Sequence, residues 1–175
     1  TFIWGIGLFV FYNNKQKKQF QAHLSTPALT TSQTHSQQQK KADSSIRTDL
    51  TIPVESSFLP RPEIMTQIDN KFKGKNGIQA VALIGPGGAG KTTLARQYAH
   101  QQKSSVIWEI NAETHESLVS SFESLAQTFA KKEEDKKILK EIQDIKDAEV
   151  KEKKVIQFVK EYLSSHPNWF FIFDN

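Results

Sequence analysis

The chain contains no cysteine, only three arginines and no apolar run long enough to cross a membrane. The lack of cysteine excludes a disulfide scaffold, a thiolate zinc site and a cysteine nucleophile, and it fits a reducing compartment such as the cytoplasm. Residues 51–175 carry no excess of positive charge, with 17 basic and 17 acidic side chains. We therefore do not expect nucleic acid as a partner, because nothing is left over to neutralise a phosphate backbone.

The longest apolar run, residues 2–12, stands at the start of the sequence and is followed by three lysines, Lys15, Lys17 and Lys18. A helix of this run would reach only about 17 Å, against a hydrocarbon core of about 30 Å. We expect residues 1–12 to be a truncated membrane anchor whose basic flank keeps the rest in the cytoplasm. A signal-peptide core, or a stretch without function, is the alternative. The ends at Thr1 and Asn175 both look cut.

Composition divides the remainder into a linker and a domain. Residues 13–57 are rich in Gln, Ser and Thr and have few apolar side chains, which predicts a disordered linker. Residues 58–175 predict one α/β domain. Its expected helices cover 63–72, 92–102 and 114–130, and its expected strands cover 79–84, 106–110 and 169–173. The unbroken apolar run 80–84 predicts a strand buried on both faces.

A long charged stretch separates the last two predicted elements. Residues 131–154 contain nine lysines and eight acidic groups, with a thin line of isoleucines at positions 138, 142 and 145. We interpret the stretch as one or two solvated helices that cover the sheet. A coiled-coil partner site is the alternative, but the apolar line lacks three full heptads.

The strongest functional signal is a glycine-rich loop between the strand at 79–84 and the following helix. Gly85-Pro86-Gly87-Gly88-Ala89-Gly90-Lys91-Thr92 matches the pattern G-x-x-x-x-G-K-[ST] in full, and Thr93 follows it. Glycines let main-chain amides wrap around a pyrophosphate, the lysine ammonium reaches the β and γ phosphates, and the threonine hydroxyl can bind Mg²⁺. The loop predicts a binding site for a nucleotide with a magnesium ion.

A carboxylate at the end of the last strand completes the predicted site. Asp174 closes an apolar strand, and the carboxyl ends of parallel strands meet at one edge of a sheet. We therefore assign Thr92 and Asp174 as magnesium ligands. The catalytic residues stay unknown, because Asn175 cannot accept a proton at neutral pH. Glu109 and Glu113 are alternative bases. The five histidines share no metal-ligand spacing.

From about residue 58 to residue 175 the chain resembles the STAND class of P-loop NTPases, specifically NB-ARC domains that precede tetratricopeptide repeats. The resemblance lies in Phe58 to Glu63, in the glycine-rich loop, in Val106 to Ala112 with Ser117-Leu118, and in Trp169 to Asn175. The family has the three-layer, parallel-sheet P-loop NTPase fold. Its Walker B strand ends in Asp-Asn, as this chain does, and its members usually have Gly where Pro60 stands here.

The resemblance implies a signalling switch that holds ADP at rest, exchanges it for ATP, hydrolyses it slowly and releases a surface for oligomerisation or effector contact. It implies that the Arg61 block lies near the adenine and that protein partners bind C-terminal repeats. It also implies an incomplete sheet, because a fourth strand that belongs between 79–84 and 169–173 is absent. A GTPase and a membrane-tethered scaffold acting through residues 131–160 are the alternatives. Asn70-Lys71-Phe72-Lys73 lacks the Asp of a guanine-reading segment.

Overall fold

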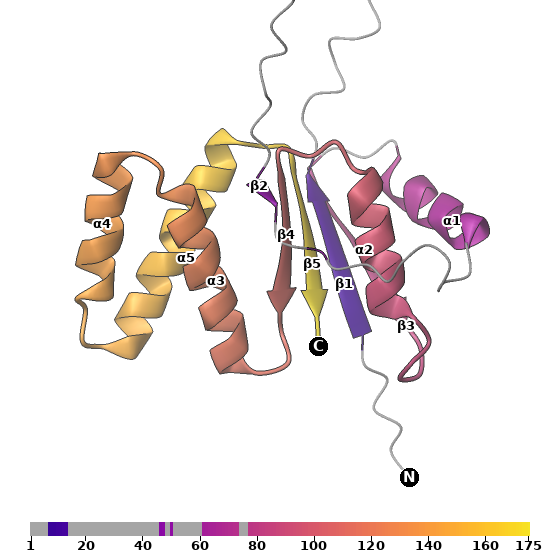
Figure 1. Ribbon diagram of the computed structural model, residues 1–175, viewed down its shortest axis with the longest axis horizontal. Helices are drawn as coiled ribbons and strands as arrows, with labels where there is room; N and C mark the ends of the chain where they lie inside the picture. Colours follow the sequence, from indigo (N-terminus) through magenta and orange to yellow (C-terminus); the bar gives the residue numbers. More distant parts are fainter. Residues whose placement is uncertain (1–6, 14–45, 48–49, 51–60, 74–76) are drawn as a thin grey trace, which may run out of the picture.

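The computed structural model describes residues 7–13, 46–47, 50, 61–73 and 77–175, and these form a three-layer α/β structure (Figure 1). The strands are β1 (Gly7–Asn13), β2 (Ile46–Arg47), β3 (Ile78–Ile84), β4 (Val106–Asn111) and β5 (Trp169–Asp174). The helices are α1 (Pro62–Phe72), α2 (Lys91–Gln101), α3 (His115–Phe129), α4 (Glu133–Gln143) and α5 (Ala148–Ser165). The predicted α/β class and the elements of residues 58–175 are confirmed, with boundaries shifted by one residue at most ends.

The five strands form one sheet in the order β2-β4-β5-β1-β3. β4 pairs in parallel with β2 and β5, whereas β1 pairs antiparallel with both β5 and β3. In Figure 1 the arrow of β1 accordingly points opposite to those of β4 and β5. β3, β4 and β5 therefore all end at the same edge of the sheet. The sheet is mixed, which corrects the expectation of a purely parallel one.

β1 occupies the place between β3 and β5 for which the sequence predicted a gap. All seven of its residues face β3, from Gly7 opposite Ile84 to Asn13 opposite Ile78, and five of them also face β5. The two strands at 79–84 and 169–173 therefore do not pair with each other, as expected. The expectation of an empty position between them is wrong, because β1, from a distant part of the sequence, forms backbone hydrogen bonds with both neighbours.

The position of β1 also differs from the helical membrane anchor expected for residues 1–12. Residues 7–13 are extended, and the side chains of Leu8 and Val10 are buried at 0% and 1% exposure. A short apolar run suits a strand in the interior of a sheet better than it suits a bilayer, which it is too short to span. In the parts of the chain that the structure describes, no helix has the length and apolar character needed to cross a membrane.

Most of the predicted linker, residues 13–57, lies outside the described residues. Besides Asn13, which ends β1, two short parts of it are placed. Ile46 and Arg47 form β2 at the edge of the sheet, and the side chains of Ile46 and Leu50 are buried in the protein. These described positions differ from the expectation of a linker without structure, because each apolar side chain finds a hydrophobic cluster to join.

Two hydrophobic clusters cover the two faces of the sheet. One face carries α1 and α2, whose Phe72 and Tyr98 pack around Phe170 of β5 with ring centroids about 6 Å apart. The other face carries α3, α4 and α5, which enclose Trp108, Phe171 and Phe129. Successive side chains of a strand point to opposite faces. The even-numbered residues of β5 therefore face α2, and the odd-numbered ones face α3.

For β3, the expectation that both faces of the strand are buried is wrong. Its side chains alternate between half-buried and exposed, and Ile78 and Ile84 are 63% and 78% exposed. The helices α3, α4 and α5 pack over β4 and β5 rather than over β3, so one face of β3 receives no cover from them. A run of apolar residues predicts a strand, but coverage of its faces depends on elements elsewhere in the chain.

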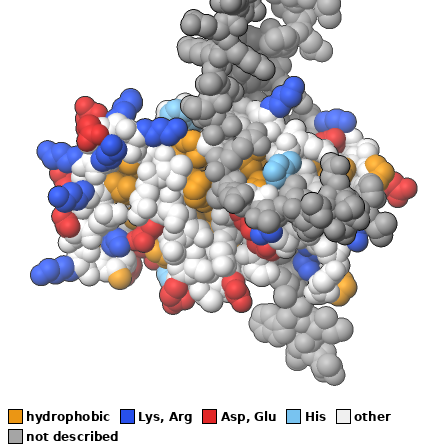
Figure 2. All heavy atoms as spheres, viewed as in Figure 1, with side chains coloured by type: hydrophobic (Ala, Val, Ile, Leu, Met, Phe, Trp, Pro, Cys, Tyr) orange, Lys and Arg blue, Asp and Glu red, His pale blue; other side chains and the backbone are white. Residues whose placement is uncertain are grey.

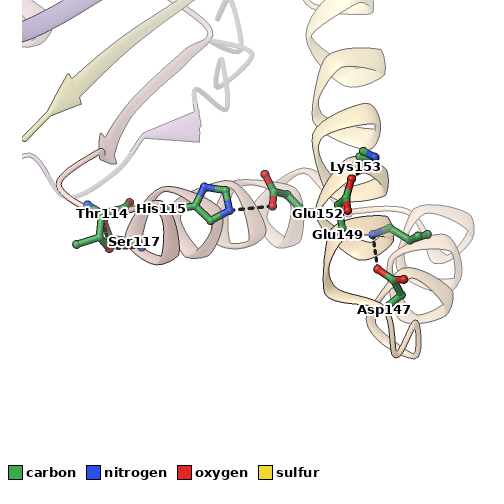
Figure 3. A network of polar contacts seen from close by, with 8 residues as sticks. Thr114, His115, Ser117, Asp147, Glu149, Glu152 and Lys153 are labelled. Atoms are coloured by element: carbon green, nitrogen blue, oxygen red, sulfur yellow. Dashed lines mark hydrogen bonds and ion pairs between the residues drawn. The ribbon is translucent and has the colours of Figure 1, made fainter.

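The charged stretch after α3 forms two helices, α4 and α5, in agreement with the interpretation of solvated helices. They bury Leu139, Ile142, Val155 and Val159 against the sheet-facing cluster. Lysines and carboxylates alternate over their outer surface at the left end of the molecule (Figure 2). Asp147 caps α5, and His115 at the start of α3 contacts Glu152 of α5 at 3.0 Å (Figure 3).

The placement of β1 generates a prediction about two adjacent residues on opposite faces. Replacing Leu8 by Ala should lower the free energy of unfolding by about 2–5 kcal/mol, because a fully buried side chain is lost from the α1–α2 cluster. Phe9→Ala is the matched control, since its side chain is 46% exposed and should cost clearly less. Urea unfolding of the 175-residue chain measures both. Equal and negligible effects would mean that residues 7–13 lie outside the sheet, as a membrane anchor requires.

Candidate functional site: a phosphate-binding loop

The glycine-rich loop lies at the edge where β3 ends and α2 begins. The strand stops at Ile84, and the first helical residue is Lys91. Gly88 and Gly90 have φ of +75° and +79°, which residues with a side chain rarely adopt. Gly87 does not have a positive φ, and a Cβ atom placed on it would have no atom within 4 Å apart from its chain neighbours. Two glycines therefore set the bend of the loop.

The first turn of α2 has free backbone donors. Gly90 is its N-cap, no side chain accepts a hydrogen bond there, and no acidic residue lies in the first turn. A helix leaves its first N–H groups without intrahelical partners, and its dipole places partial positive charge at the same end. The loop thus directs these donors at a space in which an anion is stabilised.

The lysine of the motif contacts the loop itself. Lys91 Nζ donates hydrogen bonds to the carbonyl oxygens of Gly85 and Pro86, both at 3.0 Å. The side chain is half-buried and reaches back across the loop. The ammonium is therefore held over the concave side of the loop, and an incoming phosphate oxygen can replace a carbonyl as its acceptor.

Asp174 and the threonines of the motif lie at the same edge of the sheet. Thr92 and Thr93 are half-buried in the first turn of α2. Asp174 is the last residue of β5, opposite Asn111 of β4, and its side chain shares the α2 face with those of Phe170 and Ile172. The structure thus brings the sequence-predicted residues to one edge and one face.

Arg96 also lies at this edge, and the sequence analysis did not assign it to the site. Arg96 follows Thr92 by one helical turn and therefore lies on the same side of α2. Its Nε and Nη2 donate to Glu109 Oε2 and Oε1 at 2.7 and 2.5 Å. This hydrogen-bonded ion pair raises the pKa of Arg96, and the nearby charge of Asp174 raises that pKa further, while burial opposes both. The only signal in the sequence was the four-residue spacing from Thr92.

The alternative bases considered for hydrolysis now have defined surroundings. Glu109 uses both carboxylate oxygens for Arg96, so it is held away from the role of a free base. Glu113 follows β4, its side chain is exposed, and its backbone N–H donates to Asn111 Oδ1 at 3.0 Å. Neither carboxylate is placed as a water-activating group over the loop.

Arg61 lies beside the loop. A Cβ atom placed on Gly90 would be 3.9 Å from Arg61 Nη2. The guanidinium therefore adds positive charge next to the anion-binding bend. Pro60, the residue that departs from the family pattern, lies outside the described residues.

The donor set fits magnesium rather than a transition metal. Within the described part of the chain, no group of three or more His, Cys, Asp or Glu side chains could hold a metal ion. Magnesium needs oxygen ligands and usually keeps several waters, with one carboxylate and the substrate phosphates. One threonine hydroxyl and one carboxylate, Thr92 and Asp174, match that requirement.

The fold and the loop together define a P-loop NTPase-like domain. The model of a family described as an AAA domain matches residues 78–174, which is more than half of the chain, and the chain belongs to this family. The match begins with the first residue of β3 and ends with the last residue of β5, so β1, β2 and α1 lie outside it. Neither the search of the curated proteins nor that of the solved structures gave a significant match.

The backbone geometry of the loop generates a prediction that separates two of its glycines. Gly90→Ala should destabilise the protein by about 1–2 kcal/mol, because a left-handed conformation brings Cβ too close to the backbone. Gly87→Ala should change the unfolding free energy by less than about 0.5 kcal/mol, since it has room and no positive φ. Chemical denaturation measures the pair. Equal losses would show that the bend is not set by the conformation at Gly90.

Proposed function

We propose that the chain is an ATP- and ADP-binding signalling switch of the STAND type. The observation that carries the proposal is the phosphate-binding loop. Gly88 and Gly90 set the bend that leads into the uncapped start of α2, where main-chain N–H donors are available, and the ammonium of Lys91 contacts a carbonyl oxygen of the same loop. Such a constellation binds the pyrophosphate of a nucleotide with little rearrangement.

Adenine is favoured over guanine by what the chain places near the loop. A guanine-reading segment needs an Asp, and the nearest similar run, residues 70–73, lacks it. That run ends helix α1, upstream of the loop. Arg61, at the other end of α1, is next to Gly90, where the resemblance puts a nucleotide-contacting residue. A GTPase is the competing function.

Magnesium is proposed as the partner of the nucleotide, held by Thr92 and Asp174. Held by these two side chains, a magnesium ion would offset the negative charge of the nucleotide phosphates. The chain's own residues fix the loop, supply the ammonium of Lys91 and keep a carboxylate at the same edge. Because neither Glu109 nor Glu113 is placed as a base, we propose slow hydrolysis, in which the nucleotide state rather than turnover is the output.

The signalling role rests on the resemblance, which extends from residue 58 to Asn175. We propose that exchange of ADP for ATP controls oligomerisation or effector contact through protein partners that bind C-terminal repeats. A cytoplasmic location is proposed from the lack of cysteine and from this kinship. Membrane tethering by residues 1–12 is retained as a competing role for the segment that contains β1.

The role of Lys91 leads to a ligand-dependent prediction. At a nucleotide concentration 100 times the dissociation constant, wild-type protein should gain about 2.7 kcal/mol of stability. Lys91→Ala should abolish that gain while leaving the unliganded protein nearly unchanged, because its ammonium contacts only loop carbonyls. Lys146→Ala, on the exposed α4–α5 connection, is the control. Thermal melting with and without Mg-ADP measures both. A full ligand shift in the Lys91 variant would contradict the proposal.

The identity of the nucleotide and the role of Asp174 are tested by calorimetric titration. Mg-ADP and Mg-ATP should bind, and Mg-GTP should bind at least about tenfold more weakly, which corresponds to 1.4 kcal/mol. Asp174→Asn should remove most of the difference between titrations with Mg²⁺ and with EDTA, because an amide is a poor substitute for a carboxylate at a hard cation. Preference for GTP would establish the GTPase, and no heat with any nucleotide would favour the scaffold.

A further inference from the structure

Four groups share the α2 face of the sheet at the edge of the loop. Thr92 and Arg96 are one turn apart on α2, and Glu109 and Asp174 come from neighbouring strands. Glu109 is opposite Ile172 in the register of β4 and β5, two residues before Asn111, which is opposite Asp174. Arg96 pairs with Glu109 and is near enough to Asp174 for the charge of that carboxylate to raise the pKa of Arg96; of the two carboxylates, only Asp174 belongs to the proposed magnesium site.

In the structure, Arg96 pairs with Glu109. Its guanidinium forms a two-pronged contact with Glu109, and the two side chains are only 29% and 20% exposed. Fork-to-carboxylate pairs of this kind are among the strongest and most directional polar contacts. With the guanidinium held in this way, the carboxylate of Asp174 stays available to another cation.

We propose that Glu109 is a positioning residue that holds Arg96 away from Asp174 and thereby leaves Asp174 free for Mg²⁺. The proposal rests on the proposed nucleotide function, and it assigns the balance between magnesium-dependent and magnesium-independent binding to the Arg96–Glu109 pair. Without Glu109, the Arg96 cation pairs with Asp174 and competes with the metal. Without Arg96, Glu109 adds a second negative charge beside the metal site.

Glu109→Gln and Arg96→Gln change the local charge in opposite directions, so they should shift magnesium-dependent binding in opposite directions. The quantity to measure is the magnesium coupling factor, defined as the dissociation constant for ADP in EDTA divided by that in Mg²⁺. Glu109→Gln should lower this factor by about fivefold, because Arg96, once its pair with Glu109 is lost, repels Mg²⁺, pairs with Asp174 and attracts metal-free ADP. Arg96→Gln should raise it by a similar amount, because the remaining carboxylates attract Mg²⁺ and repel metal-free ADP.

The double variant and a matched ion pair complete the experiment. Arg96→Gln combined with Glu109→Gln should return the factor to within about twofold of wild type, because the local net charge is restored. Lys151 and Glu123 form a comparable pair between α5 and α3, at 2.7 Å and 30% and 33% exposure. Glu123→Gln and Lys151→Gln should leave the factor unchanged, which controls for general effects of losing an ion pair.

A conservative variant protects the test against misfolding. Arg96→Lys keeps the charge and most of the packing, but a single ammonium cannot grip both oxygens of Glu109. It should therefore lower the coupling factor, as Glu109→Gln does, although it removes the other partner of the pair. Melting temperatures of the unliganded variants establish that each is folded before titration. A factor equal to or above that of wild type in folded Arg96→Lys would overturn the proposal.

The outcomes separate this inference from the function on which it rests. Opposite shifts in the two glutamine variants, with recovery in the double variant, support the positioning role. Shifts in the same direction, or none, with normal magnesium-dependent binding by wild type, overturn the positioning role and leave the nucleotide switch standing. Wild-type protein that binds no nucleotide in either buffer overturns both.

Discussion

The hydrogen bonding of β1 to its two neighbours is the contact on which the arrangement of the site depends. Without it β3 would have no neighbour in the sheet, because β1 alone stands between β3 and β5. The glycine-rich loop extends from the end of β3, and the carboxylate of Asp174 ends β5. The distance between loop and carboxylate is therefore set by the width of one interposed strand, about 4.8 Å on either side. Packing of α2 over both β1 and β5 supports the same spacing.

The positively charged groups of this edge lie close to the glycine-rich loop. Lys91 and Arg61 flank the bend, and the start of α2 adds its own partial positive charge. Arg96 adds a further cation at this edge, and Glu109 neutralises it in a half-buried pair. This distribution of charge is compatible with the proposed site for a magnesium nucleotide.

Much of the fold and of the site followed from local sequence patterns. The helices at α1, α2 and α3 and the strands β4 and β5 appear within about two residues of their predicted bounds, because apolar periodicity and the glycine-rich loop are local signals. Local patterns did not predict which segments form the strands of the sheet. Residues 7–13 are apolar throughout, and such a run suits a buried strand, a membrane segment or a signal core equally well on periodicity alone. The burial of β3 was misjudged for the same reason.

By itself, the sequence determined the kind of site: Gly85 to Thr92 and the apolar strand ending in Asp174 are contiguous patterns whose geometry is imposed by neighbouring residues. Only the tertiary structure decided that β1 fills the place between the two key strands and that Arg96 faces Glu109 beside Asp174. The physical reason is distance along the chain. Backbone pairing between residues 13 and 169, and an ion pair between a helix and a strand, depend on which surfaces meet after folding, and no local rule encodes that choice.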